Sequence, residues 1–169
     1  RRADGQRAQQ VRTALEAKDK YTHGHSSATM FHAVAVARDL GLSDIVELPF
    51  LDRDVLRAVY ERCDLLLLPS DREGYGLPLV EAFAAGKPVI ASDIPALREA
   101  SGGLATCLAP DDAPAWIAAV EQALAAGDPT GQLAAARRAR AAGLTWDHHV
   151  RRLLPVYAEL LERARTSRP

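Results

Sequence analysis

The chain has 169 residues, of which 48% are hydrophobic, and its formal net charge is −1. That length suffices for one domain with its own core, and no run reaches the roughly 20 apolar residues of a membrane span. Because no signal-peptide pattern opens the chain and Cys63 and Cys107 lack metal-ligand spacing, we expect a reduced, cytoplasmic protein.

Charge is unevenly distributed along the chain. Residues 21–130 carry seven basic and sixteen acidic groups, whereas residues 131–169 carry eight basic and three acidic groups. A nucleic-acid surface needs clustered Lys and Arg, so the acidic middle argues against a nucleic-acid partner. The basic C-terminal part suits a solvated helix face. The alternative is contact with a partner or with acidic lipid, at the inner face of a membrane.

The predicted elements alternate between helix and strand from residue 26 onward. Residues 1–25 are polar and form a poorly defined N-terminal segment with a helix expected only at 6–18, so we expect one domain over 26–169. Apolar or β-branched runs predict strands at 44–48, 64–69, 88–92 and 103–109. Helical periods and end signals predict helices at 28–41, 52–63, 79–86, 94–101, 113–127, 131–143 and 146–164. This order predicts an α/β fold with an open parallel sheet, helices on both faces and a helical C-terminal end.

The loop of residues 70–78 follows the most apolar strand, where an open α/β sheet binds its ligand. Gly74 and Gly76 let the backbone turn and approach a ligand closely. Pro78 suits the first position of the next helix. The N–H groups of Tyr75, Gly76 and Leu77 are then free at a helix N-terminus, which favours phosphate.

Two glutamates eight positions apart, Glu73 and Glu81, accompany this loop. We expect Glu81 in the first helical turn, where a carboxylate is suited to accept both hydroxyls of a ribose. Each residue alone also has a local explanation, since glycines end strands, prolines start helices and a glutamate in a first turn stabilises the helix dipole. Their combination in one short span favours a binding site.

The segment PSDREGYGLPLVEAFAAGKPVIASD resembles the donor-binding segment of retaining glycosyltransferases of the GT-B fold. The signature of that family is E-x7-E within E-G-[FY]-G-L-P-x-x-E-A, and residues 73–82 match it throughout. The flanking stretches YERCDLLLLPS and LTWDHHVRRLLPVYAELL resemble the same family, so the likeness covers about residues 40–165. It implies the Rossmann-like C-terminal half of a GT-B fold, which binds a nucleotide-diphosphate sugar without a cofactor or a metal.

The resemblance also implies roles for individual residues. Glu73 takes the catalytic position and contacts hydroxyls of the donor sugar, while Glu81 holds the ribose. Backbone amides around Gly74 to Leu77 meet the diphosphate and the sugar. Leu51 lies near the nucleotide base, and Ser70, at the end of the central strand, lies within reach of the site.

Two parts of that family are missing from the sequence. Its members carry an N-terminal domain for the acceptor and a G-R-x-x-x-x-K-G segment whose Arg and Lys meet the diphosphate, and neither is present here. The remaining candidate cations are Arg53, Arg72, Lys87 and Arg98. We therefore expect a part of a larger retaining hexosyltransferase that is inactive alone, with a glycan, lipid or small molecule as the acceptor. The alternatives are a non-catalytic nucleotide-sugar binding module and, less favoured, a related epimerase.

The last predicted helix carries an apolar stripe at helical spacing, formed by Val150, Leu153, Leu154, Tyr157, Leu160 and Leu161. In the family that this chain resembles, the last helix crosses to the acceptor domain. With that domain missing, the stripe is expected to be at least partly exposed, or covered by self-association. Trp146, at the start of the helix, is predicted to pack in a small satellite cluster.

Overall fold

The computed structural model describes residues 38, 41 and 51–166, and the first strand and most of the first helix expected from the sequence lie outside these residues. Arg38 is helical and Gly41 is in a turn with φ of 72°, in agreement with a helix that ends at Gly41. The N-terminal segment 1–25 also lies outside the described residues.

The described part of the chain contains one parallel sheet of three strands, which confirms the predicted topology for that part. The strands are β1 (Leu66–Leu68), β2 (Val89–Ser92) and β3 (Thr106–Leu108), in the order β1-β2-β3. All residues of β1 and β2 are buried, as expected for strands covered on both faces. β3 is only partly buried, which agrees with its weaker sequence pattern.

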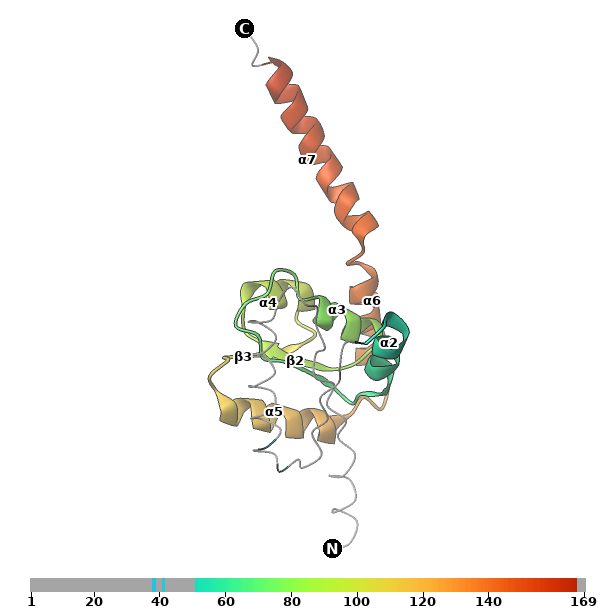
Figure 1. Ribbon diagram of the computed structural model, residues 1–169, viewed down its shortest axis with the longest axis vertical. Helices are drawn as coiled ribbons and strands as arrows, with labels where there is room; N and C mark the ends of the chain where they lie inside the picture. Colours follow the sequence, from blue (N-terminus) through green and yellow to red (C-terminus); the bar gives the residue numbers. More distant parts are fainter. Residues whose placement is uncertain (1–37, 39–40, 42–50, 167–169) are drawn as a thin grey trace, which may run out of the picture.

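Six helices surround and extend this sheet in the described part (Figure 1): α2 (Arg53–Arg62), α3 (Leu77–Ala84), α4 (Pro95–Ser101), α5 (Ala113–Ala126), α6 (Gln132–Ala142) and α7 (Trp146–Thr166). Side-chain caps fix three of the N-termini, and at α7 the hydroxyl of Thr145 accepts from the His148 amide at 3.2 Å. The carboxylate of Asp52 accepts from the Val55 amide at 2.9 Å, and that of Asp112 accepts from the Ala115 amide at 3.1 Å.

The core lies on both faces of the sheet, because successive side chains of a strand point to opposite faces. On one face Leu66, Leu68 and Ala91 pack with the buried side of α3 and with Leu97 of α4. On the other face α5 covers the sheet (Figure 1). Trp116 packs there against Leu65, Leu67 and Ile90. The indole of Trp116 also donates to the Ala109 carbonyl at 2.8 Å.

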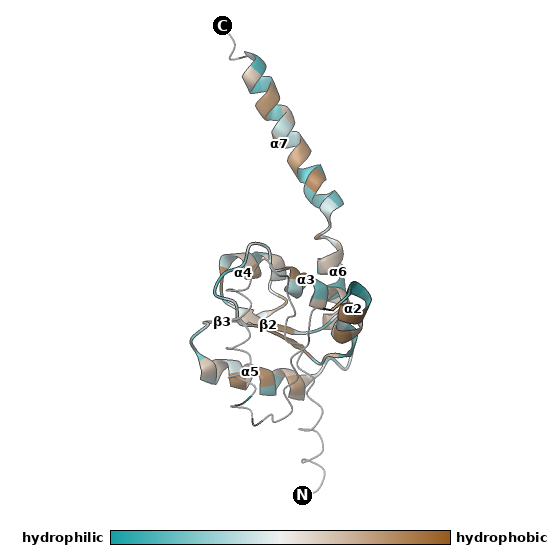
Figure 2. Cartoon of the chain, in the orientation of Figure 1, coloured by the Kyte–Doolittle hydropathy of each residue, from teal (hydrophilic) through white to brown (hydrophobic). Residues whose placement is uncertain are grey.

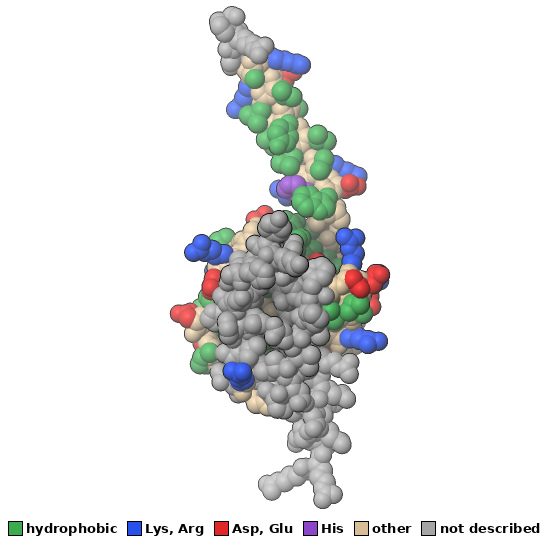
Figure 3. All heavy atoms as spheres, in the orientation of Figure 1, with side chains coloured by type: hydrophobic (Ala, Val, Ile, Leu, Met, Phe, Trp, Pro, Cys, Tyr) green, Lys and Arg blue, Asp and Glu red, His purple; other side chains and the backbone are tan. Residues whose placement is uncertain are grey.

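The helix α7 extends away from the sheet and its covering helices, and every residue of it is exposed (Figure 1). Hydrophobic residues recur along its ribbon (Figure 2), and their side chains lie along its surface (Figure 3). The exposed fractions of Leu154 and Leu161 are 59% and 62%. The predicted exposure of the apolar stripe is therefore confirmed. No helix in the described ranges is both long and apolar enough to cross a bilayer.

The prediction that Trp146 packs in a satellite cluster is wrong. Trp146 is 80% exposed, and its indole meets the ring of His149, edge to face, with 6.0 Å between ring centroids. The tryptophan that packs is Trp116, which is 1% exposed. Trp146 is left exposed because it opens α7, whose apolar face packs on no other element of the described domain.

Candidate functional site

The loop between β1 and α3 is shaped by one glycine, Gly76. This residue is the N-cap of α3 and has φ of 78° and ψ of 46°, in the left-handed region that side chains rarely adopt. A Cβ added to Gly76 would lie 2.6 Å from Cδ2 of Leu97 on α4. Gly74 differs, because its φ is not positive and a Cβ there would meet no atom of the described residues within 4 Å. The fold thus requires Gly76, whereas the space beside Gly74 is open to a ligand.

The start of α3 corrects two predictions. The helix begins at Leu77, so Pro78 is its second residue and Glu81 its fifth, in the second turn. The helix begins earlier than predicted because the carbonyl of Gly76 already accepts from the amides of Leu79 at 3.1 Å and Val80 at 3.3 Å. Dipole stabilisation falls off within the first turn. The local explanation for Glu81, a charge in the first turn of a helix, is therefore removed.

The N-terminus of α3 presents unpaired backbone donors. Within the described ranges, the N–H groups of Tyr75, Gly76 and Leu77 donate to no other residue. Tyr75 and Leu77 are 45% and 48% exposed, so the edge of this helix end is open to solvent. Amide donors and a helix dipole that point the same way form a site for an anionic group.

Glu73 is held by a serine at the end of the strand. Ser70 is 1% exposed and lies two residues after β1, and its hydroxyl donates to Oε1 of Glu73 at 2.9 Å. The carboxylate of Glu73 is half-buried. The sequence predicted both residues near the site, and the structure brings them into direct contact.

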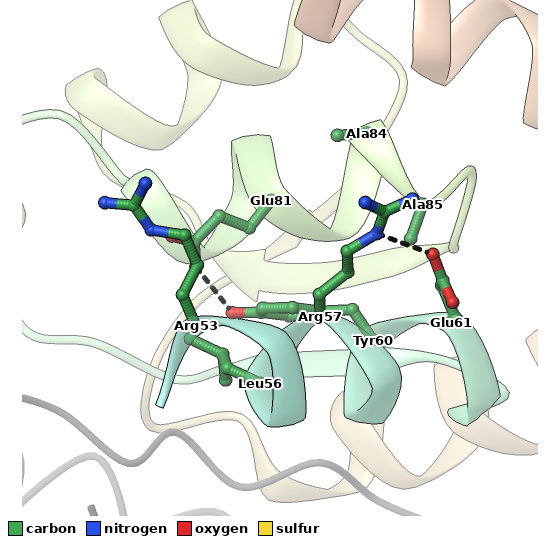
Figure 4. A pocket seen from close by; sticks show the side chains of 8 residues that line it. All are labelled: Arg53, Leu56, Arg57, Tyr60, Glu61, Glu81, Ala84 and Ala85. Carbon is green, nitrogen blue, oxygen red and sulfur yellow. Dashed lines mark hydrogen bonds and ion pairs between the residues drawn. The ribbon is translucent and has the colours of Figure 1, made fainter. Parts of the chain in front are cut away.

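Glu81 is held by a tyrosine that the sequence analysis did not assign to the site. The phenol of Tyr60, on α2, donates to Oε2 of Glu81 at 3.0 Å (Figure 4). The residue type could have indicated this contact, since the hydroxyl of a buried tyrosine needs a hydrogen-bond partner.

A hollow of about 340 Å³ lies between α2 and α3 beside this contact (Figure 4). It is lined by Arg53, Leu56, Arg57, Tyr60, Glu61, Glu81, Ala84 and Ala85. Leu51, which was predicted near the site, is half-buried two residues before α2 and does not line this hollow.

The candidate cations separate into two groups. Arg98 forms a salt bridge with Asp93, and this contact holds the pKa of Asp93 below its ordinary value. Lys87 lies just before β2, at the opposite end of the sheet from the loop, and is half-buried there. Arg53, beside the hollow, and Arg72, exposed in the loop, remain on the side of the two glutamates. No three His, Cys, Asp or Glu side chains of the described residues are grouped to hold a metal.

We expect the two glycines of the loop to respond differently to substitution. Gly76→Ala should lower the free energy of unfolding by roughly 1–3 kcal/mol, because the left-handed backbone is strained and the methyl group meets Leu97. Gly74→Ala, the matched control, should change it by less than about 0.5 kcal/mol. Urea unfolding of both variants measures this, and equal destabilisation would contradict the assignment of the turn to Gly76.

Comparison with known proteins places this fold and loop in a class. Residues 21–126 match the family model described as glycosyl transferases group 1, and the chain belongs to this family. It is similar to sucrose-phosphate synthase from Thermosynechococcus elongatus, with a TM-score of 0.65 and 25% identity over 89% of this chain and 38% of that chain. This likeness supports the GT-B-type fold predicted from the sequence.

Particular relatives carry a more specific name. The chain is 35% identical over 132 residues to the D-inositol 3-phosphate glycosyltransferase of Gordonia bronchialis, covering 76% of this chain and 29% of that protein. It is 35% identical over 144 residues to the enzyme of the same name from Mycolicibacterium gilvum, covering 82% of this chain and 31% of the relative. The chain thus spans about three tenths of the length of these relatives.

Proposed function

We propose that this chain is the donor-binding domain of a retaining glycosyltransferase and that it holds a nucleotide-diphosphate sugar. The observation that carries the proposal is the pair of glutamates beside the open N-terminus of α3. Each is held through one carboxylate oxygen by a hydroxyl of the protein, Glu73 by Ser70 and Glu81 by Tyr60. The other oxygens, Oε2 of Glu73 and Oε1 of Glu81, bond to no other described residue and are available to a ligand.

The parts of a nucleotide-sugar match the groups around this loop. The amides of Tyr75, Gly76 and Leu77 would meet the diphosphate, where the helix dipole favours negative charge. Glu81 would accept from the ribose hydroxyls and Glu73 from the sugar, with Leu51 on the side of the base. Gly74 leaves room for the sugar, because nothing stands within 4 Å of the position of its missing side chain.

Transfer in this proposal depends on electrostatics and positioning. The leaving group is a nucleoside diphosphate, and donors at the N-terminus of α3 would stabilise the charge that develops on it. Glu73 would orient the sugar toward the acceptor. Retention at the anomeric carbon is proposed from the E-x7-E segment, and no metal or cofactor is required.

The acceptor is a glycan, a lipid or a small molecule, and its site is proposed to lie in a further domain. The relatives are about three times as long as the matched segment, which leaves room in those proteins for such a domain. The second candidate function, a non-catalytic nucleotide-sugar binding module, is favoured by the scarcity of cations. Of the four cations considered from the sequence, Arg53 and Arg72 lie on the side of the two glutamates. Arg140 and Arg152 line a separate hollow beside Gly74 and Tyr75.

The purified 169-residue chain is expected to bind UDP or GDP weakly and to transfer no sugar. Without added cations or an acceptor domain, we expect a Kd on the order of 0.1–1 mM. Calorimetric titration with UDP, GDP and ADP measures binding, and incubation with UDP-glucose or GDP-mannose and a mixture of acceptors measures transfer. Binding of none of the three nucleotides would contradict the donor site, whereas transfer would contradict the need for a second domain.

A further inference from the structure

The side chain of Tyr60 is fixed by the core, whereas that of Glu81 is exposed. Tyr60 is 7% exposed, and its ring belongs to the core cluster that contains Leu79 and Phe83 of α3. The helix that carries it, α2, is held at its start by the Asp52 cap. The phenol oxygen is thus a donor at a defined position between α2 and α3.

Glu81 has no comparable anchor of its own. It lies on the exposed side of α3, and a free glutamate there would exchange among several rotamers. The hydrogen bond from Tyr60, at 3.0 Å to Oε2, selects one of them (Figure 4). A ligand that binds a side chain already held in place does not have to order it, and affinity rises accordingly.

The donor at this position is a neutral hydroxyl, which occupies one acceptor position of the carboxylate. The nearby Arg57 would offer a cation, but its guanidinium is paired with Glu61 at 2.8 Å and points toward that residue (Figure 4). Each carboxylate oxygen has about two acceptor positions. Glu81 can therefore accept from the phenol and still accept from both hydroxyls of a vicinal diol.

We propose that Tyr60 is a positioning residue for nucleotide binding, because its phenol holds the Glu81 carboxylate ready for the ribose diol. This inference rests on the proposed donor site and adds to it a residue of another helix. It also assigns a ligand preference to the contact: the pair favours a ribonucleotide over a 2′-deoxyribonucleotide, which lacks one of the two hydroxyls.

A double-mutant cycle in the full chain tests this proposal. UDP and 2′-deoxy-UDP are titrated by calorimetry into the unmodified chain, Tyr60→Phe, Glu81→Ala and the double variant, with GDP and 2′-deoxy-GDP as a second pair. Phenylalanine keeps the ring in the core, so thermal unfolding should stay close to that of the unmodified chain. Tyr157→Phe, the same change at a side chain of α7 that is 60% exposed, is the matched control.

The expected result has three parts. Tyr60→Phe weakens UDP binding by roughly 3- to 10-fold, the range for loss of one hydrogen bond. It has no further effect in the Glu81→Ala background, since the tyrosine acts through the glutamate. It also narrows the preference for UDP over 2′-deoxy-UDP, a ratio that a purely structural role would leave unchanged. Tyr157→Phe changes none of these quantities.

Other outcomes separate this inference from the proposed function. If Glu81→Ala weakens binding and Tyr60→Phe does not, the positioning role is wrong and the donor site stands. Two outcomes would show a structural role and overturn the inference. In one, Tyr60→Phe lowers affinity equally with and without Glu81. In the other, it lowers affinity equally for ribonucleotides and deoxyribonucleotides. If Glu81→Ala itself leaves UDP and GDP binding unchanged, the ribose contact fails and this inference fails with it.

Discussion

Replacing Glu81 with alanine is expected to weaken binding of a free nucleoside diphosphate and of its nucleotide-sugar by the same factor. Hydrogen bonds to a charged group contribute about 1.5–3 kcal/mol, which corresponds to roughly a 10- to 150-fold loss of affinity. The loss is common to both ligands because the ribose that Glu81 is proposed to hold is part of both. Calorimetric titration of the variant with UDP and UDP-glucose, or with GDP and GDP-mannose, gives the two factors.

Glu73→Ala provides the contrast within the same site. Glu73 is proposed to meet only the sugar, so this variant should bind the free nucleotide as the unmodified chain does and should lose the preference for the sugar-bearing ligand. Ser70, which donates to Glu73 at 2.9 Å, is buried and stays in place in this variant. Equal losses for both ligands in both variants would contradict the division of roles.

Glu121→Ala is a suitable control for both variants. Glu121 is an exposed glutamate on α5, which covers the face of the sheet opposite to α3. Its removal makes the same change in net charge without touching the loop. If this control weakened nucleotide binding as much as Glu81→Ala, the effect would come from overall charge and the assigned contact would be wrong.

Leu79→Ala is expected to lower the free energy of unfolding by about 2–5 kcal/mol, the range for removal of a buried leucine side chain. Leu79 is 0% exposed and packs in the core cluster with Phe83 and Leu97. It lies on α3 two residues before Glu81, so the packing that anchors this helix also positions the proposed ribose contact. A loss of this size is comparable to the total stability of a small domain.

Leu154→Ala makes the same chemical change on an exposed surface. Leu154 lies on α7 and is 59% exposed, so its removal from the isolated chain should change the free energy of unfolding by less than about 0.5 kcal/mol. Urea titrations of both variants at the same low protein concentration measure the two differences. A large effect of Leu154→Ala under these conditions would mean that the stripe on α7 is covered in solution.

Much of this fold follows from local sequence patterns. The doubly apolar run at 64–69 predicted a central strand because both of its faces need cover, and β1 is buried on both faces in the structure. Asp52 directly precedes an apolar helical period, where a short carboxylate satisfies a free amide, and it accepts from the Val55 amide. Ser70 and Glu73 are three residues apart, so their closeness in one loop was also within reach of sequence reasoning.

The sequence by itself determined the family, the parallel α/β order and the residues of the loop, because these depend on motifs, periods and caps over short distances. Tertiary structure decided the contacts between distant residues: Tyr60 meets Glu81 across 21 positions, and Leu97 lies against Gly76, whose left-handed backbone already favours glycine. It also decided that Trp116, the fourth residue of α5, packs in the core while Trp146, the first residue of α7, does not. Only the packing of α5 on the sheet, and the separation of α7 from it, distinguish these two residues.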